Sequence, residues 1–243
     1  MAKADGKGRI KKRGQMAEAW ARMKTQPIAV ISLVVVLLMV VIAIFADLIV
    51  PYSKAINQVA ADKLLPPFTA GHILGTDNFG RDIFARIIHG TRTALEIGII
   101  SAGASIVVST ILACLCATIG GWVDNILMRF IDVVSCIPSL VMALGICAAL
   151  GNGVPQLIFA LFFTGLPMHT KMVRSVSLGV AKMDYVESSI ALGAKSSYIM
   201  GRHLIPNLAS VIIINGTAQV SMNIMMGATL GFVGLGVKAP TPE

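Results

Sequence analysis

The run from Ile28 to Ala46 constrains this chain more than any other feature, because its 19 residues contain one polar side chain, Ser32. As a helix the run would be about 28 Å long, which is enough to cross the hydrocarbon core of a bilayer. It is too long for the apolar core of a usual signal peptide, and no small-residue cleavage site follows it. We therefore predict a membrane-spanning helix rather than a removed leader.

Further apolar runs extend this prediction to the whole chain. Hydrophobic residues make up 56% of the chain, charged residues 13%, and the mean hydropathy is +0.80. Such values exclude an ordinary soluble domain. We predict an all-α polytopic membrane protein with five spans, at 28–48, 95–119, 131–150, 155–173 and 208–230. The predicted divisions are a basic cytoplasmic tail at 1–26, a first span at 27–50, an external loop with an amphipathic segment at 51–92, and a bundle domain at 93–243 with a loop at about 182–207.

The external loop ends in the segment Arg81–Thr91, in which Ile83, Phe84, Ile87 and Ile88 fall on one helical face. Such a face suits the bilayer surface, and it equally suits packing against a neighbouring helix. The sequence alone leaves both alternatives open.

Charge predicts the orientation of the chain in the membrane. Eight Lys and Arg residues precede Pro27, against Asp5 and Glu18, and basic segments beside a first span stay in the cytoplasm. Counting five spans from there places the basic loop 174–207 in the cytoplasm as well. The external loop also carries five Lys and Arg residues, which weakens the bias without reversing it. Nucleic-acid binding by the tail is disfavoured, because an apolar span follows it directly and no recognition motif accompanies it.

No pattern in the chain predicts catalysis, a metal site or a bound cofactor. The string Ala194-Lys195-Ser196 lacks the glycines that a phosphate-binding loop needs. No Asp, Glu, Lys or Arg lies in the middle of a predicted span, where proton-coupled transporters usually place an ionisable group. The energy for transport is therefore expected from another protein. All four cysteines lie in apolar segments and suit packing better than metal binding: Cys114, Cys116, Cys136 and Cys147.

Two rows of residues with four-residue spacing distinguish the predicted spans. The first, in the second span, is made of small residues and predicts close packing against another helix: Ser101, Ser105, Ser109, Ala113, Ala117 and Gly121. The second row is Asn215, Gln219 and Asn223 in the last span. Amides on an apolar helix need partners or water, so they either form hydrogen bonds between helices or line a wet path for a polar solute. We favour the path, because this helix leads directly out of the 182–207 loop.

The segment Tyr185–Asn207 is polar and basic and lies between two apolar runs. Asp184 is expected to cap a short helix, with Glu187 completing a capping box. Gly193 is expected to end or bend that helix, and a second helix at about 196–204 is expected to stop before Pro206. Such an element either docks on a soluble partner or forms a solvated helical hairpin.

These residues resemble a known motif. Glu187-Ser188-Ser189-x-x-x-Gly193, followed after nine residues by His203-Leu204-Ile205-Pro206, resembles the EAA loop of permeases from binding-protein-dependent ABC importers. Two serines replace the alanines of that pattern, and His203 replaces an isoleucine. The string HILGTDNFGRD at 72–82 and the string GLGVKAPTPE at 234–243 are similar to the peptide and nickel branch of the family. The similarity covers nearly the whole chain.

The resemblance implies a type I ABC importer transmembrane bundle in a bacterial or archaeal plasma membrane, with a sixth span that family members carry beyond the position of Glu243. It also implies partners: a second, similar permease, an external solute-binding protein, and two cytoplasmic ATPase subunits that hold ATP and Mg²⁺. By the same resemblance, the residues that couple the permease to an ATPase are Glu187, Ser188, Ser189, Ala191, Gly193, Ala194, His203 and Pro206.

The peptide branch implies import of dipeptides or oligopeptides, with nickel or glutathione as alternatives in the same class of importer. A channel or secondary transporter that works without ATPases is an alternative from another class, and so is a purely structural membrane subunit. A nucleotide-hydrolysing partner that co-purifies with the chain would exclude the channel. Normal uptake after replacement of the three amides by leucine would favour the structural subunit.

Overall fold

The computed structural model describes residues 20, 23–69 and 71–243, so most of the predicted tail at 1–26 lies outside the described residues. In the described part the chain forms helices and no strand, which confirms the all-α prediction. The elements are α2 (Pro27–Ile44), α3 (Ala46–Ile49), α4 (Tyr52–Ile56), η1 (Ala60–Asp62), α5 (Ile83–Ile119), α6 (Gly121–Ser135), α7 (Ser139–Leu150), α8 (Val154–Ala181), α9 (Asp184–Ala191), α10 (Ser196–Ile199), η2 (Met200–Leu204) and α11 (Ile205–Phe232).

Three helical stretches among the described residues are long and apolar enough to cross a membrane. They are α2, α5, and the stretch Ser196–Phe232, which combines α10, η2 and α11. The pair of α6 and α7 makes a fourth if the two helices count as one span. The predicted span at 155–173 corresponds to α8, which is long enough but less apolar. A lower hydropathy is expected of α8, because it packs along α5 and buries one whole side in the bundle.

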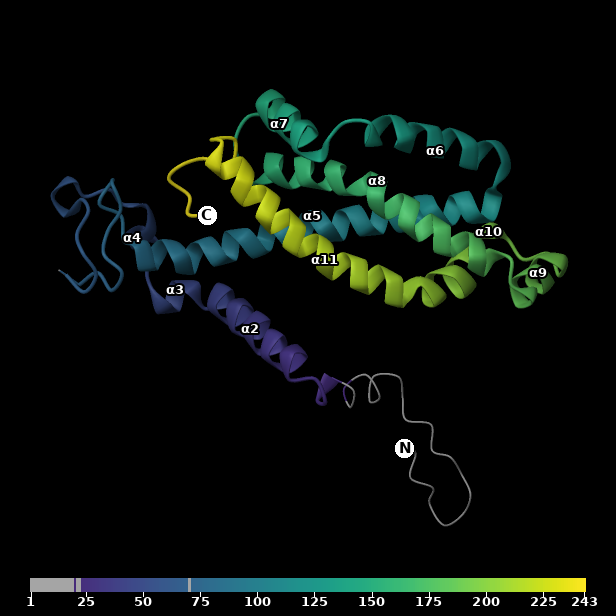
Figure 1. The fold of residues 1–243 in the computed structure, drawn as a ribbon, viewed down its shortest axis with the longest axis horizontal. Coiled ribbons are helices and arrows are strands. Elements are labelled where there is room, and N and C mark those ends of the chain that lie inside the picture. The colour runs from purple at the N-terminus through teal and green to yellow at the C-terminus, as the bar shows by residue number, and fades with distance from the viewer. Residues whose placement is uncertain (1–19, 21–22, 70) are drawn as a thin grey trace, which may run out of the picture.

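The bundle is built around α5, whose 37 residues make it about 55 Å long. α8 and α11 lie along it (Figure 1). Ser105 and Ser109 of the small-residue row donate hydrogen bonds to the backbone carbonyls of Phe162 and Leu166 on α8, at 2.6 and 3.2 Å. Such contacts require close approach of the two backbones, which small side chains permit. The predicted packing role of this row is confirmed.

The predicted third span, 131–150, is not one helix. α6 ends at Ser135, α7 begins at Ser139, and the two are bent by 85°. The break falls at Ile137-Pro138, because proline offers no N–H and disfavours a helical conformation in the residue before it. α6 therefore runs beside α8 rather than continuing into α7.

Two ion pairs attach α6 to α8. The guanidinium of Arg174 donates to both carboxylate oxygens of Asp124, with its Nε 2.6 Å from Oδ1. Lys171, almost one turn earlier on α8, places its Nζ 2.8 Å from Oδ1 of Asp132. The opposite face of α6 exposes Trp122 and other large apolar side chains. The position of α6 thus depends on charged contacts more than on a shared apolar core.

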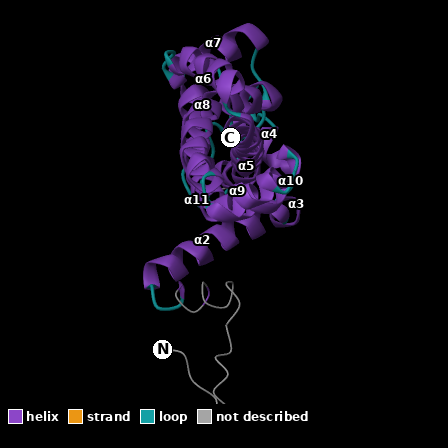
Figure 2. Cartoon of the chain, turned by 90° about the vertical axis from the view of Figure 1, so that its right-hand side faces the viewer, coloured by secondary structure: helices purple, strands orange, loops and turns teal. Residues whose placement is uncertain are grey.

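The first membrane helix, α2, diverges from the bundle (Figures 1 and 2). Only 6% of its apolar stretch is buried, and it packs mainly against α5. Apolar side chains all around a helix are stable in lipid or against another protein but not in water. α2 is therefore positioned for contact with the bilayer or with another protein.

The segment Arg81–Thr91 forms the first turns of α5 rather than a separate helix. Asp82 caps these turns by accepting a hydrogen bond from the N–H of Ala85 at 2.9 Å. Ala85 and Ile88 are buried in a cluster with Ala46 of α3, Val50 just after it and Ala55 of α4. Phe84 also packs against this cluster, whereas Ile87 is 53% exposed, so packing against neighbouring helices is realised for part of the predicted face.

The loop before α5 is folded by polar contacts. His72 Nδ1 lies 2.7 Å from Oδ2 of Asp82. Asp77 accepts hydrogen bonds from the backbone N–H groups of Phe79 and Arg81 and from Arg81 Nε. Partial burial alone would raise the pKa of Asp77, but these donors outweigh that effect and hold the pKa below its ordinary value of 3.8.

Candidate functional site

The 182–207 loop forms the end of the molecule where α9 lies (Figure 1). α9 begins at Asp184, and the residue in the capping position is Met183, whose backbone carbonyl accepts from the N–H groups of Val186 and Glu187. The predicted capping box of Asp184 and Glu187 is therefore wrong, because Asp184 already lies within the helix. Both carboxylates instead occupy the first turn, where the helix dipole favours negative charge.

Gly193 ends α9 as predicted. Its φ angle is +84°, and its N–H donates to the carbonyl of Ile190 at 2.9 Å. The N–H of Ala194 reaches back to the carbonyl of Ser189 at 3.0 Å. These two bonds form a Schellman motif, which needs a left-handed residue at this place and therefore favours glycine.

The second helix of the loop does not stop before Pro206. α10 passes through one π-helical turn, η2, directly into α11, so the predicted end is wrong. In η2 the N–H of Ile205 donates to the carbonyl of Met200, five residues back. The wider turn carries the helix past Pro206, which has no N–H to donate and occupies the first turn of α11, where proline is tolerated. The loop is thus joined rigidly to the membrane helix.

His203 connects α9 to this π-helical turn. Its Nε2 lies 3.2 Å from the Oγ of Ser189, and since that hydroxyl already donates to the carbonyl of Tyr185, it accepts from His203. The imidazole centroid lies 5.5 Å from the ring of Tyr185 and 5.7 Å from that of Tyr198. Asn207 Nδ2 donates to the Tyr185 hydroxyl at 3.2 Å and to the carbonyl of His203. We call these five residues the His203 cluster.

Tyr185, Tyr198 and Asn207 were not among the predicted site residues. These three residues are spread over 23 positions. Two are tyrosines and one is an asparagine, and no spacing or motif in the sequence links them. The π-helical turn rotates His203 toward α9, and local propensity does not predict that turn. The cluster follows from the three-dimensional path of the loop.

One buried side chain anchors α9 to the bundle. Val186 is fully buried and belongs to a hydrophobic cluster with Ala113 and Cys114 of α5 and Val173 of α8. The predicted coupling residues Glu187, Ser188 and Ala191 lie exposed on α9, Ser189, Ala194 and His203 are half-buried, and Gly193 and Pro206 are exposed in the turns. The structure therefore gathers the predicted residues at one end of the bundle and presents several of them to the surroundings.

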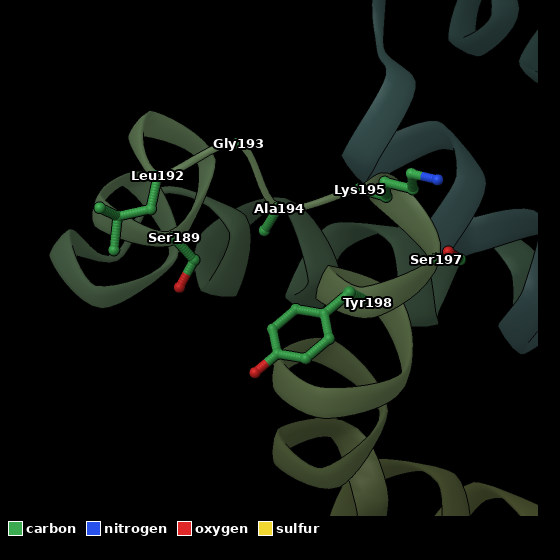
Figure 3. Close-up of a pocket in the computed structure, with 7 residues that line it drawn as sticks. All are labelled: Ser189, Leu192, Gly193, Ala194, Lys195, Ser197 and Tyr198. Atoms are coloured by element: carbon green, nitrogen blue, oxygen red, sulfur yellow. The ribbon is translucent and has the colours of Figure 1, made fainter.

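A pocket of about 460 Å³ lies between α9 and α10. Ser189 and Leu192 form one side, Tyr198 forms the other, and the Gly193–Ala194 backbone joins them (Figure 3). Leu192 is 89% exposed and Tyr198 54% exposed. The loop thus carries a concave, partly apolar surface next to the exposed face of α9.

The amide row of α11 forms part of a hydrogen-bonded relay across three helices. His169 Nε2 on α8 lies 2.9 Å from Oε1 of Gln219, Gln219 Nε2 donates to Oδ1 of Asn223 at 2.7 Å, and Asn223 Nδ2 donates to Oγ of Ser101 at 2.6 Å. Ser101 in turn donates to the carbonyl of Ile97. All donors point the same way, so His169 carries its proton on Nε2.

Gly165 on α8 allows Gln219 to reach this position. A Cβ at Gly165 would lie 2.8 Å from Gln219 Nε2, closer than such atoms approach in proteins. Of the two sequence alternatives, hydrogen bonding between helices is realised for Gln219 and Asn223. Asn215 stays outside the relay, because its Nδ2 donates to the carbonyl of Val211 in its own helix.

No cluster of His, Cys, Asp or Glu side chains in the described part of the chain could hold a metal ion. Cys114, Cys116 and Cys147 are buried and Cys136 is exposed, all of them as free thiols. The functional features that the described residues provide are therefore a structured loop and a polar relay inside a helical bundle.

Comparison with known proteins assigns these features to a family. Residues 105–243 match the model of the binding-protein-dependent transport system inner membrane component. Residues 14–67 match the N-terminal transmembrane domain of oligopeptide transport permease C. The glutathione transport system permease protein of Pectobacterium atrosepticum is 35% identical over 93% of this chain and 75% of its own length. The dipeptide transport system permease protein of Alkalihalophilus pseudofirmus is 32% identical over 93% of this chain and 74% of its own.

Proposed function

We propose that this chain, which belongs to the family of inner membrane components of binding-protein-dependent transport systems, is the permease through which an ATP-driven importer moves small peptides into the cell. The chain is a membrane permease subunit and has no catalytic role of its own in this proposal. The names of its relatives refer to the transport of dipeptides and of glutathione. Both solutes contain an amide bond and a free amine, so the two names support a peptide-like solute. Nickel remains the alternative solute within the same class of importer.

The observation that carries the proposal is the rigid connection from α9 to α11. α9 is anchored by Val186, ended by the Schellman motif at Gly193 and joined to η2 by the His203 cluster. A force applied to α9 would therefore reach α11 without being lost in a flexible loop. In the proposal an ATPase subunit seats the exposed residues Glu187, Ser188 and Ala191, and its closure on ATP moves α11.

The proposed orientation places the N-terminus and the 182–207 loop in the cytoplasm. The basic residues Lys182, Lys195 and Arg202 support it, because short loops that carry Lys and Arg stay inside. The remaining partners in the proposal are a second, similar permease and an external solute-binding protein. α2, which is apolar on all sides, offers a surface for lipid or for that second permease.

The proposed path for the solute runs along α11 at Asn215. Gln219 and Asn223, which were predicted to line the same path, are occupied by the relay between helices in this conformation. Asn215 is the sharpest test of this path, because it takes no part in the relay that holds the helices together. Replacement of Asn215 by leucine is expected to slow uptake and to leave the fold intact. Unchanged uptake in that variant would remove Asn215 from the path and favour a structural role for the row.

The central experiment measures coupling in the assembled transporter. Glu187→Lys is expected to uncouple ATP hydrolysis from uptake in proteoliposomes, because it reverses the charge on the exposed face of α9. Asp184→Lys is the matched control, since it also removes an acid from the first turn of α9 and reproduces any loss from the helix dipole alone. Equal uptake by both variants and the unmodified protein would contradict the proposal, and so would uptake that needs no ATP.

A further inference from the structure

Docking of α9 into an ATPase does not account for the pocket beside it. We propose that this pocket, lined by Ser189, Leu192, the turn at 193–195, Ser197 and Tyr198, is a socket that receives one aliphatic or aromatic side chain of the ATPase subunit, with a carboxylate of that subunit beside it. The inference rests on the proposed function and adds a second contact to it. In this arrangement α9 inserts into the ATPase subunit, and one side chain of the ATPase subunit inserts into the socket.

The shape and the lining of the socket fit such a side chain. Its volume of about 460 Å³ accommodates an aromatic ring, and Leu192 and Tyr198 supply apolar surface on opposite sides. Both side chains are largely exposed in the isolated chain. Anchors of this kind, seated in pockets near the centre of an interface, carry much of the affinity between proteins.

The socket is rigid before a partner arrives. The two backbone bonds of the Schellman motif fix Gly193 and Ala194, which join its walls. Tyr198 is held edge-on against His203, which is bonded in turn to Ser189 on the opposite wall. A site that is already ordered loses little entropy on binding, so its contacts contribute more of their energy to affinity.

Charge indicates the second part of the partner's chemistry. Lys195 lines the socket, and Lys182 and Arg202 belong to the same loop. None of these three cations forms an ion pair with another of the described residues. The acids of the loop, Asp184 and Glu187, lie in the first turn of α9, at the end far from Lys195. A carboxylate beside the inserted side chain would meet this unpaired charge.

A photo-crosslinking amino acid at position 198 tests the occupant directly. The transporter is purified through a tag on this chain, and the crosslinked ATPase peptide is sequenced by mass spectrometry. We expect one aliphatic or aromatic residue of the ATPase with an Asp or Glu near it. A crosslink to a polar surface without such a residue would overturn the socket.

Filling the socket tests its energetic role. Ala194→Leu places a larger side chain between the walls and is expected to weaken ATPase binding by about tenfold. Ser196→Leu is the matched control, because Ser196 is exposed and does not line the pocket. Tyr198→Ala removes the ring that forms one side of the socket and adds no bulk to it. This variant is expected to weaken ATPase binding to a similar extent. Equal ATPase binding by Ala194→Leu, Tyr198→Ala and Ser196→Leu would overturn the socket.

The same crosslinks separate this inference from the proposed function. Capture of the ATPase from position 188 but not from position 198 overturns the socket and leaves the coupling role of α9 in place. Capture from neither position overturns both.

Discussion

His169 and Gln219 join α8 to α11 through a hydrogen bond of 2.9 Å between Nε2 and Oε1, although 50 residues separate them in the sequence. Both belong to a relay that ends on α5. His169 is 4% exposed and Asn223 2% exposed. The relay therefore replaces water as the partner of polar groups in an apolar bundle.

Gln219→Leu is expected to lower the thermal stability of the purified permease, because it removes the partner of the buried His169 and one of the two partners of the buried Asn223. The expected loss is about 1–2 kcal/mol. Asn215→Leu is the control and is expected to change stability by less than about 0.5 kcal/mol, since Asn215 bonds only its own helix. Equal melting temperatures of the two variants would show that the relay contributes nothing to stability.

Gly193→Ala is expected to weaken coupling by forcing a left-handed conformation on a residue with a Cβ, at a cost of about 1–2 kcal/mol. The effect is conformational, because a Cβ at this position would touch nothing within 4 Å. Uptake per ATP hydrolysed is the measurement. Gly179→Ala is the matched control: its Cβ also meets nothing, and its position inside α8 suits alanine. If both variants transport equally well, the shape of the turn at 193 is not required.

Asp124→Asn is expected to release α6 from α8, because it removes the charge from a paired carboxylate that is largely shielded from solvent. A loss of about 1–3 kcal/mol is expected for this charge-assisted pair. Asp47→Asn is the control, since its pair with Arg92 is mostly exposed and worth less than about 1 kcal/mol. Protease accessibility of the α6–α7 turn is the measurement, and equal cleavage of both variants would contradict the prediction.

The loop before α5 is expected to lose structure in acid. Its Asp77 has a pKa below the ordinary 3.8, so the carboxylate stabilises the folded loop above that value. The stabilisation is lost as the pH falls below about 4, through the lower folded pKa, when protonation weakens the bonds from Arg81. The protection factors for hydrogen exchange of residues 72–82 should fall in this range. Asp77→Asn should remove the pH dependence, and a loop that opens equally with and without Asp77 would contradict the prediction.

Local properties of the sequence determined much of this protein. Apolar runs predicted the three long apolar stretches in α2, α5 and α11, because hydropathy depends on composition alone. Gly193 predicted the end of α9, since a positive φ is a property of one residue. The motif around Glu187 and Gly193 predicted the family, which the comparisons confirmed.

Tertiary structure decided the features that depend on partners far away in the chain. Whether Pro206 ends a helix was decided by the π-helical turn before it, and the attachment of α6 to α8 was decided by the ion pairs of Arg174 and Lys171. Gln219 and Asn223 form hydrogen bonds between helices instead of binding water, because His169 and Ser101 lie within reach. Only the packing of α5 and α8 against α11 places these two partners there. Side-chain chemistry states what a residue can bind, but a polar group in a membrane takes whichever partner the fold places within about 3 Å.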